Sequence, residues 1–260
     1  LYSCVETSGS AWMRQPLTPD DEPSSVMVEP RYRGSGTRKD TRTHTLGAMG
    51  TRQAEGEGNP PPTVDVAARL LGVFRNTYYS FPNEAEYSGS KTKIFDASCK
   101  LIAEVPTTFH DMLCVQGSGR LASARTVSFA KRNCDCAAVC PRSGQKICYE
   151  ALDPAKYPYG RGALGKAITP FRTIAVDDKV IALGTAVFIP AYVSQPMPDG
   201  SVHDGCFRAE DRGLKVVGHS VDVFTGGEAD TKAWNQLVPT GQGVEVYVDH
   251  PRCKARWPDG

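Results

Sequence analysis

The chain has 260 residues and a formal net charge of +1 at pH 7, with 30 Lys and Arg residues against 29 Asp and Glu residues. This balance excludes strong electrostatic steering by the whole molecule, and we expect no nucleic-acid partner. No stretch approaches the about 18 apolar residues of a spanning helix, so we expect no membrane span. An apolar signal-peptide region is also missing, which predicts a mature or trimmed form.

The first 63 residues differ in composition from the rest. They are rich in Pro, Gly, Ser, Thr and mixed charges and lack apolar periodicity. This composition predicts a disordered polar tail over 1–63, which ends in a Pro-rich linker at 60–62. The basic stretch 31–52 is either a solvated linker or a segment that rests on an anionic surface. The folded domain is expected at 64–260.

After the tail, short apolar segments follow one another with Gly- and Pro-rich turns between them. Helical spacing is expected at 64–71, 107–115 and 228–237. Strands are expected at 72–80, 93–95, 101–105, 125–130, 163–169, 173–176, 185–189, 206–210, 220–225 and 243–248. This pattern predicts a mainly β fold with short helices, built on a small barrel rather than a doubly wound sheet.

Nine cysteines favour an oxidising compartment, so we expect a periplasmic or extracellular protein. Four of them form a compact group in a segment at about 131–160, namely Cys134, Cys136, Cys140 and Cys148. Their spacing does not match a paired C-x-x-C zinc ribbon, which favours disulfides over a metal. We expect at least three disulfides between Cys99 and Cys253, with Cys4 outside them. A Cys206–Cys253 bridge would tie the start of one strand to the end of the last.

The stretch 205–225 contains two alternating segments around a turn bounded by Gly213 and Gly218. Each segment carries one aspartate: Asp211 follows the apolar face of its segment, and Asp222 lies on the face opposite two valines. Paired carboxylates in unlike environments are what cleavage of a glycosidic bond needs. The alternative is that both residues are ordinary strand-end aspartates.

Several separate motifs resemble the three-aspartate domain of the membrane-bound lytic transglycosylase A family. They are 173–177 (TIAVD), 181–185 (IALGT), 208–213 (RAEDRG) and 218–224 (GHSVDVF), with 115–121 (VQGSGRL) upstream. The resemblance covers roughly residues 72–253. It implies a six-stranded double-psi β-barrel. It also implies an enzyme, a lytic transglycosylase that cleaves the MurNAc–GlcNAc β-1,4 bond of peptidoglycan without water and leaves 1,6-anhydro-MurNAc ends.

The resemblance also implies a set of site residues. By register, Asp222 falls on the catalytic acid/base, with Asp211 and Asp177 as the other two aspartates, although face analysis makes Asp211 the more apolar. Candidate substrate-binding residues are Tyr78, Tyr79, Gln116, Ser118, Arg212 and Phe224. One acid suffices for this chemistry, so no metal or cofactor is expected. The expected partner is the peptidoglycan glycan strand, and the protein is expected to be a monomer.

Three features depart from the family pattern. Arg212 stands where the family usually has a small or apolar residue, and Val217 and Ser220 stand where relatives have a Lys and an Arg. Only about thirty residues separate Phe129 from Tyr159, the place of the family's second domain, which predicts a short glycan groove. A second hypothesis is therefore a non-catalytic carbohydrate-binding barrel of the barwin or expansin kind.

Overall fold

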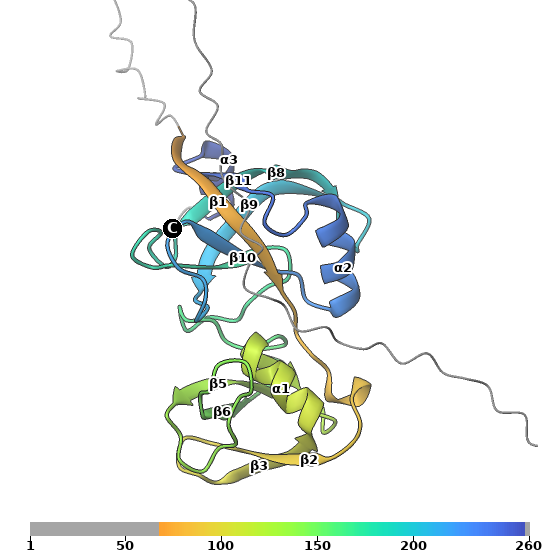
Figure 1. Cartoon of the computed structure of the whole chain (residues 1–260). Coiled ribbons are helices and arrows are strands. Elements are labelled where there is room, and N and C mark those ends of the chain that lie inside the picture. Colours follow the sequence, from red (N-terminus) through yellow and green to blue (C-terminus); the bar gives the residue numbers. More distant parts are fainter. Residues whose placement is uncertain (1–67, 258–260) are drawn as a thin grey trace, which may run out of the picture. The chain divides into compact units, whose positions relative to one another are not determined.

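The computed structural model describes residues 68–257. The tail predicted at 1–63 and Cys4 lie outside these residues. Six strands form a closed barrel (Figure 1), and they are β1 (Arg69–Tyr79), β7 (Thr173–Val176), β8 (Ala186–Pro196), β9 (Val202–Asp211), β10 (Ser220–Phe224) and β11 (Val244–Val248). They lie in the order β1-β10-β7-β9-β8-β11, and two pairs, β1/β10 and β7/β9, are parallel. The predicted mainly β fold with a six-stranded barrel is confirmed.

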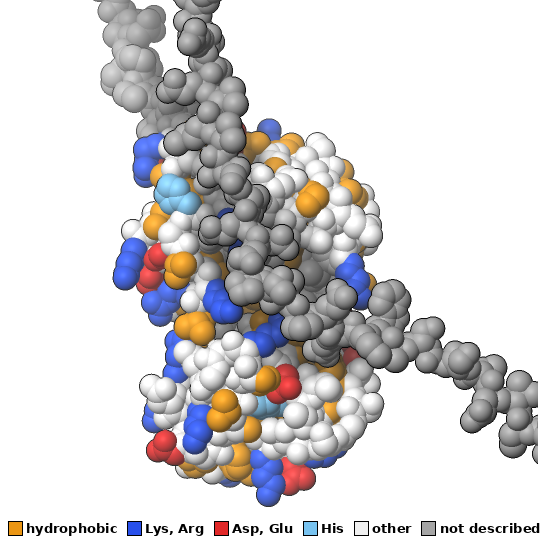
Figure 2. All heavy atoms as spheres, viewed as in Figure 1, with side chains coloured by type: hydrophobic (Ala, Val, Ile, Leu, Met, Phe, Trp, Pro, Cys, Tyr) orange, Lys and Arg blue, Asp and Glu red, His pale blue; other side chains and the backbone are white. Residues whose placement is uncertain are grey.

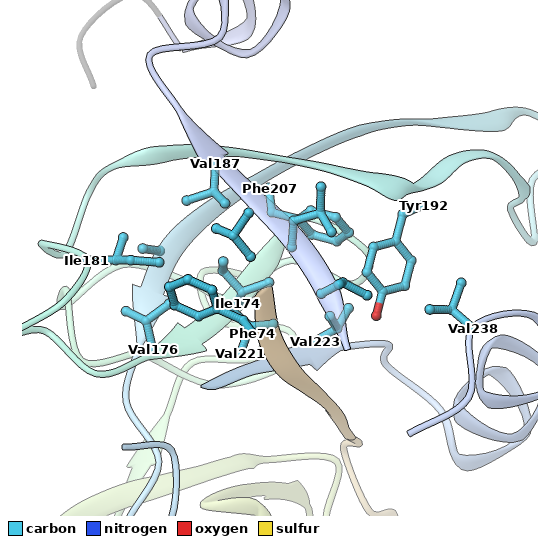
Figure 3. Packing of buried hydrophobic residues seen from close by; sticks show 14 of the residues in the cluster. Phe74, Ile174, Val176, Ile181, Val187, Tyr192, Phe207, Val221, Val223 and Val238 are labelled. Atoms are coloured by element: carbon cyan, nitrogen blue, oxygen red, sulfur yellow. The ribbon is translucent and has the colours of Figure 1, made fainter. Parts of the chain in front are cut away.

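The barrel encloses a core of alternating strand residues (Figure 3). Phe74, Phe207, Val221 and Val223 are fully buried inside it, and Tyr192 packs in the same cluster. Burial of one such side chain stabilises the fold by about 1.5–3 kcal/mol. On the face seen in Figure 2, hydrophobic side chains are scattered singly or in small groups among polar ones, as expected once the apolar faces point inward.

A long insertion lies between β1 and β7. It contains the short 3₁₀ helix η1 (Glu84–Glu86), α1 (Thr107–Gln116), and the strands β2 (Lys91–Phe95), β3 (Leu101–Pro106), β4 (Ser118–Arg120), β5 (Thr126–Arg132) and β6 (Ile147–Leu152). β2 pairs with β3, and β4-β5-β6 form a second sheet. The insertion has its own core, which includes Phe109, Leu113 and Tyr149.

The insertion is larger than the sequence indicated, because it starts directly after β1. The cysteine-rich segment at about 131–160 forms only its last part, together with β6. The part of the chain that can form the second wall of a glycan groove is therefore not limited to the thirty residues between Phe129 and Tyr159.

Most of the predicted elements are present. The helices expected at 107–115 and 228–237 are α1 and α2 (Glu228–Leu237), and a further short helix, α3 (Pro251–Arg256), ends the described chain. Two predictions are wrong. Residues 69–71 of the helix expected at 64–71 belong to β1, because pairing with β11 overrides the local helical spacing. The strand expected at 163–169 is a loop, in which the backbone N–H groups of Ala163 and Leu164 donate to residues of β9.

Four disulfides join the cysteines between Cys99 and Cys253, which confirms the predicted framework. The pairs are Cys99–Cys136, Cys114–Cys140, Cys134–Cys148 and Cys206–Cys253. Three of them lie in the insertion, and the predicted Cys206–Cys253 bridge ties β9 to α3. Residues 68–257 contain no helix with the length and hydropathy of a membrane span.

Candidate active site

A cavity of about 710 Å³ opens between the barrel and the insertion. Its lining on the barrel side includes Tyr79, Ala175, Asp211, Arg212 and Asp222. On the insertion side it includes Gln116, Ser118, Phe129, Arg132 and Gln145, and the loop before β7 adds Arg161 and Ala163. Two of the three predicted aspartates therefore face one cavity.

The register of four adjacent strands explains why Asp211 and Asp222 face the same cavity. Thr77 of β1 lies opposite Asp222 of β10, Asp222 lies opposite Ala175 of β7, and Ala175 lies opposite Asp211 of β9. Residues directly opposite each other in a sheet share a face. The four residues thus form one row across the barrel wall. With neighbouring strands about 4.8 Å apart, the backbones of Asp222 and Asp211 are about 10 Å apart, separated by the small side chain of Ala175.

Asp211 reaches this row through a β-bulge. Simple alternation after Phe207 and Ala209, which are both fully buried, would turn Asp211 into the barrel core. The register against β7 shifts between Ile174↔Ala209 and Ala175↔Asp211, so that β9 has one extra residue there. A bulge of this kind re-aims the following side chain. It turns Asp211 out of the core and into the cavity.

Asp222 lies in an environment that favours its protonated form. Burial raises the pKa of this carboxyl from 3.8 to about 6, and the negative charge of Asp211 adds to the increase. The hydroxyl of Thr77 donates a hydrogen bond of 2.7 Å to Oδ1 of Asp222, which opposes the increase by stabilising the carboxylate. A pKa near 6 allows the group both to give and to take a proton close to neutral pH.

Asp211 is held more tightly than Asp222. Its Oδ1 accepts hydrogen bonds from the backbone N–H groups of Ala163 (3.0 Å) and Arg212 (2.9 Å), and its Oδ2 accepts one from the hydroxyl of Tyr79 (3.2 Å). Burial raises the pKa of Asp211 above its usual value, and these three donors offset only part of the increase. The pKa of Tyr79 is well above its usual value through burial and the two aspartates, so its hydroxyl remains a donor. Asp211 is thus held in place as a hydrogen-bond acceptor by three donors, whereas among the described residues Asp222 accepts a hydrogen bond from Thr77 alone.

The loop that supplies the Ala163 donor comes very close to β9. A Cβ atom on Gly162 would lie 2.6 Å from the carbonyl oxygen of Glu210, so that only glycine fits there. The N–H of Leu164 also donates to this carbonyl, at 2.9 Å. The sequence predicted a strand at 163–169. In the structure this segment is a loop, and it holds the Asp211 carboxylate through the hydrogen bond from Ala163.

Asp177 has a different position. It follows β7 and is not among the residues that line the cavity. Its Oδ2 accepts the N–H of Gly218 at 2.7 Å and its Oδ1 accepts the N–H of Lys179, and these two bonds lower its pKa. Gly218 has a φ of +60°, the left-handed conformation that the turn before β10 requires. Asp177 therefore anchors the turn that leads into the Asp222 strand.

The predicted substrate-binding residues divide into two groups. Tyr79, Gln116, Ser118 and Arg212 line the cavity. Tyr78 packs on the barrel core and its hydroxyl bonds the carbonyl of Val238, while Phe224 is fully buried beside Tyr79. The structure therefore brings four of the six to the cavity and places two in the cores. Arg212 forms an ion pair with Asp178 at 2.8 Å, and Val217 is an exposed residue of the adjacent turn.

Sequence reasoning missed several cavity residues. Thr77 was recognisable only as a polar residue within a strand, and Ala175 lay within a quoted motif without a role. Arg132, Gln145 and Ala163 come from the insertion and the loop. No local signal places these three beside the aspartates, because their proximity depends on contacts between segments distant in sequence.

Comparison with known proteins identifies the domain type. The family model of the 3D domain matches residues 172–248. The expected resemblance is confirmed. Among solved structures, Escherichia coli MltA with bound chitohexaose is similar, with 15% identity, 68% of this chain and 71% of that chain covered, and a TM-score of 0.50. At this identity the likeness concerns the fold.

Two further solved structures are lytic transglycosylases from other bacteria. The membrane-bound lytic murein transglycosylase of Agrobacterium tumefaciens has 13% identity over 70% of this chain and 75% of that chain, with a TM-score of 0.47. LtgG of Burkholderia pseudomallei has 22% identity over 68% of this chain and 66% of that chain, with a TM-score of 0.35. A comparison with curated proteins finds no match.

Proposed function

We propose that this protein is a lytic transglycosylase, which cleaves the MurNAc–GlcNAc β-1,4 bond of peptidoglycan and leaves 1,6-anhydro-MurNAc ends. The observation that carries the proposal is Asp222, a partly buried carboxyl with a pKa of about 6 in a cavity of about 710 Å³. The MltA structure with chitohexaose, which shares this fold, supports a β-1,4-linked glycan as the ligand of the cavity.

In the proposed reaction Asp222 acts twice. The protonated carboxyl first donates its proton to the glycosidic oxygen as the bond from this oxygen to the anomeric carbon breaks. The carboxylate then takes the proton of the C6 hydroxyl of the same sugar, while that oxygen bonds to the anomeric carbon. No water is consumed, and the proton lost in the first step is regained in the second.

The neighbours of Asp222 adjust its pKa, so that it can both donate a proton and accept one. The ionised Asp211 favours the proton on Asp222, and the Thr77 hydrogen bond favours its loss. Asp211, which accepts three hydrogen bonds, is proposed to stay charged beside the positive charge that develops on the sugar ring. Asp177 is proposed to act indirectly, through the turn that it anchors.

Tyr79, Gln116, Ser118 and Arg212 are proposed to contact the glycan, and the proposed partner is the peptidoglycan strand. We propose that residues 64–260 form the three-aspartate barrel domain with its insertion. The four disulfides support a periplasmic or extracellular location. We propose that the protein acts as a monomer.

The test is digestion of purified sacculi followed by mass analysis of the soluble products. The wild-type protein should release muropeptides that end in 1,6-anhydro-MurNAc. Asp222→Asn removes the titratable proton with little change of shape and should lower the rate by about 10²–10⁴-fold. Asp135→Asn, at an exposed position in the cysteine-rich segment, is the matched control and should leave the rate unchanged.

Two results would contradict the proposal. Products with reducing MurNAc ends would mean that water is the nucleophile and that a second carboxylate serves as its base. Tight binding of glycan without any product would favour the carbohydrate-binding barrel instead.

A further inference from the structure

Three arginines line the cavity, and two of them are neutralised by a carboxylate. Arg161 forms an ion pair with Glu150, and Arg212 forms one with Asp178. Arg132 differs from both. Within the described part of the chain, no carboxylate oxygen lies within 4.0 Å of its guanidinium nitrogens. Arg132 therefore brings an uncompensated positive charge to the wall that the insertion contributes.

The guanidinium of Arg132 is held in place by two neighbours that also line the cavity. Its Nε donates a hydrogen bond of 3.1 Å to Oε1 of Gln145, and its Cζ lies 4.8 Å from the centre of the Phe129 ring. The N–H of Gln145 in turn donates to the hydroxyl of Ser143 at 3.3 Å. An arginine fixed on both its Nε side and its flat face loses little entropy when it binds a ligand.

This arrangement leaves the end of the guanidinium available. Among residues 68–257, the two terminal nitrogens of Arg132 have no hydrogen-bond acceptor, whereas Arg161 and Arg212 each donate from one terminal nitrogen to a carboxylate. Two parallel N–H groups at the end of a guanidinium match the two oxygens of a carboxylate. The end of the Arg132 guanidinium therefore fits an anion of carboxylate geometry.

We propose that Arg132 binds a carboxylate group carried by the glycan, and so selects a carboxylate-bearing β-1,4 glycan over a neutral one. The inference rests on the function proposed above and specifies the substrate of the same cavity. In peptidoglycan the MurNAc sugar carries a lactyl group, which ends either in a free carboxylate or in a peptide with its own carboxylates. A neutral polymer of GlcNAc has neither group. The shared chemistry of both sources is the carboxylate.

The proposal is tested by measuring the binding and cleavage of three glycans by the full chain. Chitohexaose is the neutral glycan, peptide-free GlcNAc–MurNAc oligomers carry only the lactyl carboxylate, and muropeptide oligomers carry the peptide carboxylates. The variant is Arg132→Gln, with Arg132→Lys to retain the charge without the planar fork. Lys131→Gln removes the neighbouring exposed charge, which does not line the cavity, and is the matched control.

We expect Arg132→Gln to weaken binding of one or both carboxylate-bearing glycans by about tenfold and to leave chitohexaose binding unchanged. The affinity of Arg132→Lys for the carboxylate-bearing glycans should lie between those of the wild type and Arg132→Gln. The affinity of Lys131→Gln should match that of the wild type. A loss on peptide-free oligomers assigns the lactyl carboxylate, and a loss on muropeptides alone assigns the peptide. An equal loss on chitohexaose, or no loss on any glycan that the wild type cleaves, would overturn the role of Arg132 while the transglycosylase proposal stands. A wild-type protein that neither binds nor cleaves any of the three would overturn both.

Discussion

The raised pKa of Asp222 has a consequence for stability that can be measured without substrate. A carboxyl with a pKa of 3.8 in the unfolded chain and about 6 in the folded one binds its proton more tightly when folded. Folding is therefore not penalised below about pH 4, where both states are protonated. As the pH rises through 6, the folded state must hold a partly buried charge. At 1.36 kcal/mol per pH unit, this cost approaches 3 kcal/mol.

Asp222→Asn removes this charge and retains an oxygen that can accept the hydrogen bond of Thr77. Since the side chain is partly exposed and solvent screens its charge, we expect a gain of about 1–3 kcal/mol above pH 7. For a folded unit of this size the gain corresponds to roughly 3–10 °C in Tm. The inactive variant should thus be the more stable protein, a trade-off that catalytic sites commonly show.

The assay is thermal unfolding of wild type and Asp222→Asn, followed by circular dichroism at several pH values between 4 and 8. The difference in Tm should be largest at pH 7–8 and should shrink towards zero near pH 4. Asp135→Asn, which removes an exposed charge, should track the wild type throughout. An Asp222→Asn protein that is less stable than the wild type at pH 7.5 would refute the reasoning, as would a difference independent of pH.

Three further predictions concern neighbouring features. Thr77→Val removes the 2.7 Å hydrogen bond to Asp222, and the pH above which activity falls should rise by about one unit, measured as the midpoint of the pH–rate profile. Ala175→Leu fills the space between the two aspartates and should lower kcat/KM by about 10–100-fold, measured on glycan strands alongside Tm to detect overpacking. Replacing Cys206 and Cys253 together by alanine opens a loop of 47 residues, and unfolding by denaturant should show a loss of about 4 kcal/mol.

The orientation of Asp222 could be predicted from the sequence because β10 is regular. Val221 and Val223 alternate with Asp222, and the structure buries both valines completely. The same rule fails for Asp211, because the extra residue in β9 inverts the alternation at the end of the strand. A bulge depends on the register against a partner strand, and a single sequence does not contain that register. The cluster of site motifs therefore indicated the right strands, but not the direction of every side chain.

The insertion shows a second limit of prediction from the sequence. Its helix α1 was predictable from apolar spacing, and its disulfides from cysteine density. Its contribution to the cavity was not predictable, because Gln116, Arg132 and Gln145 come to line the same cavity as the aspartates only through contacts between distant segments. Arg132 has the sequence context of an ordinary exposed charge at the end of a strand. Within residues 68–257 no carboxylate lies close to its guanidinium, and this property, which distinguishes Arg132, is revealed only by the structure.

The site combines a firmly held strand with a destabilising side chain, and the two are connected. β10 is a central strand of the barrel wall, paired with β1 on one side and β7 on the other, and its valines pack in the core. These contacts stabilise the strand by more than the cost of about 3 kcal/mol assigned to Asp222. They also fix the backbone on which an acid must sit if it is to give and take a proton at defined points on a sugar. The barrel core thus both tolerates the buried carboxyl and positions it.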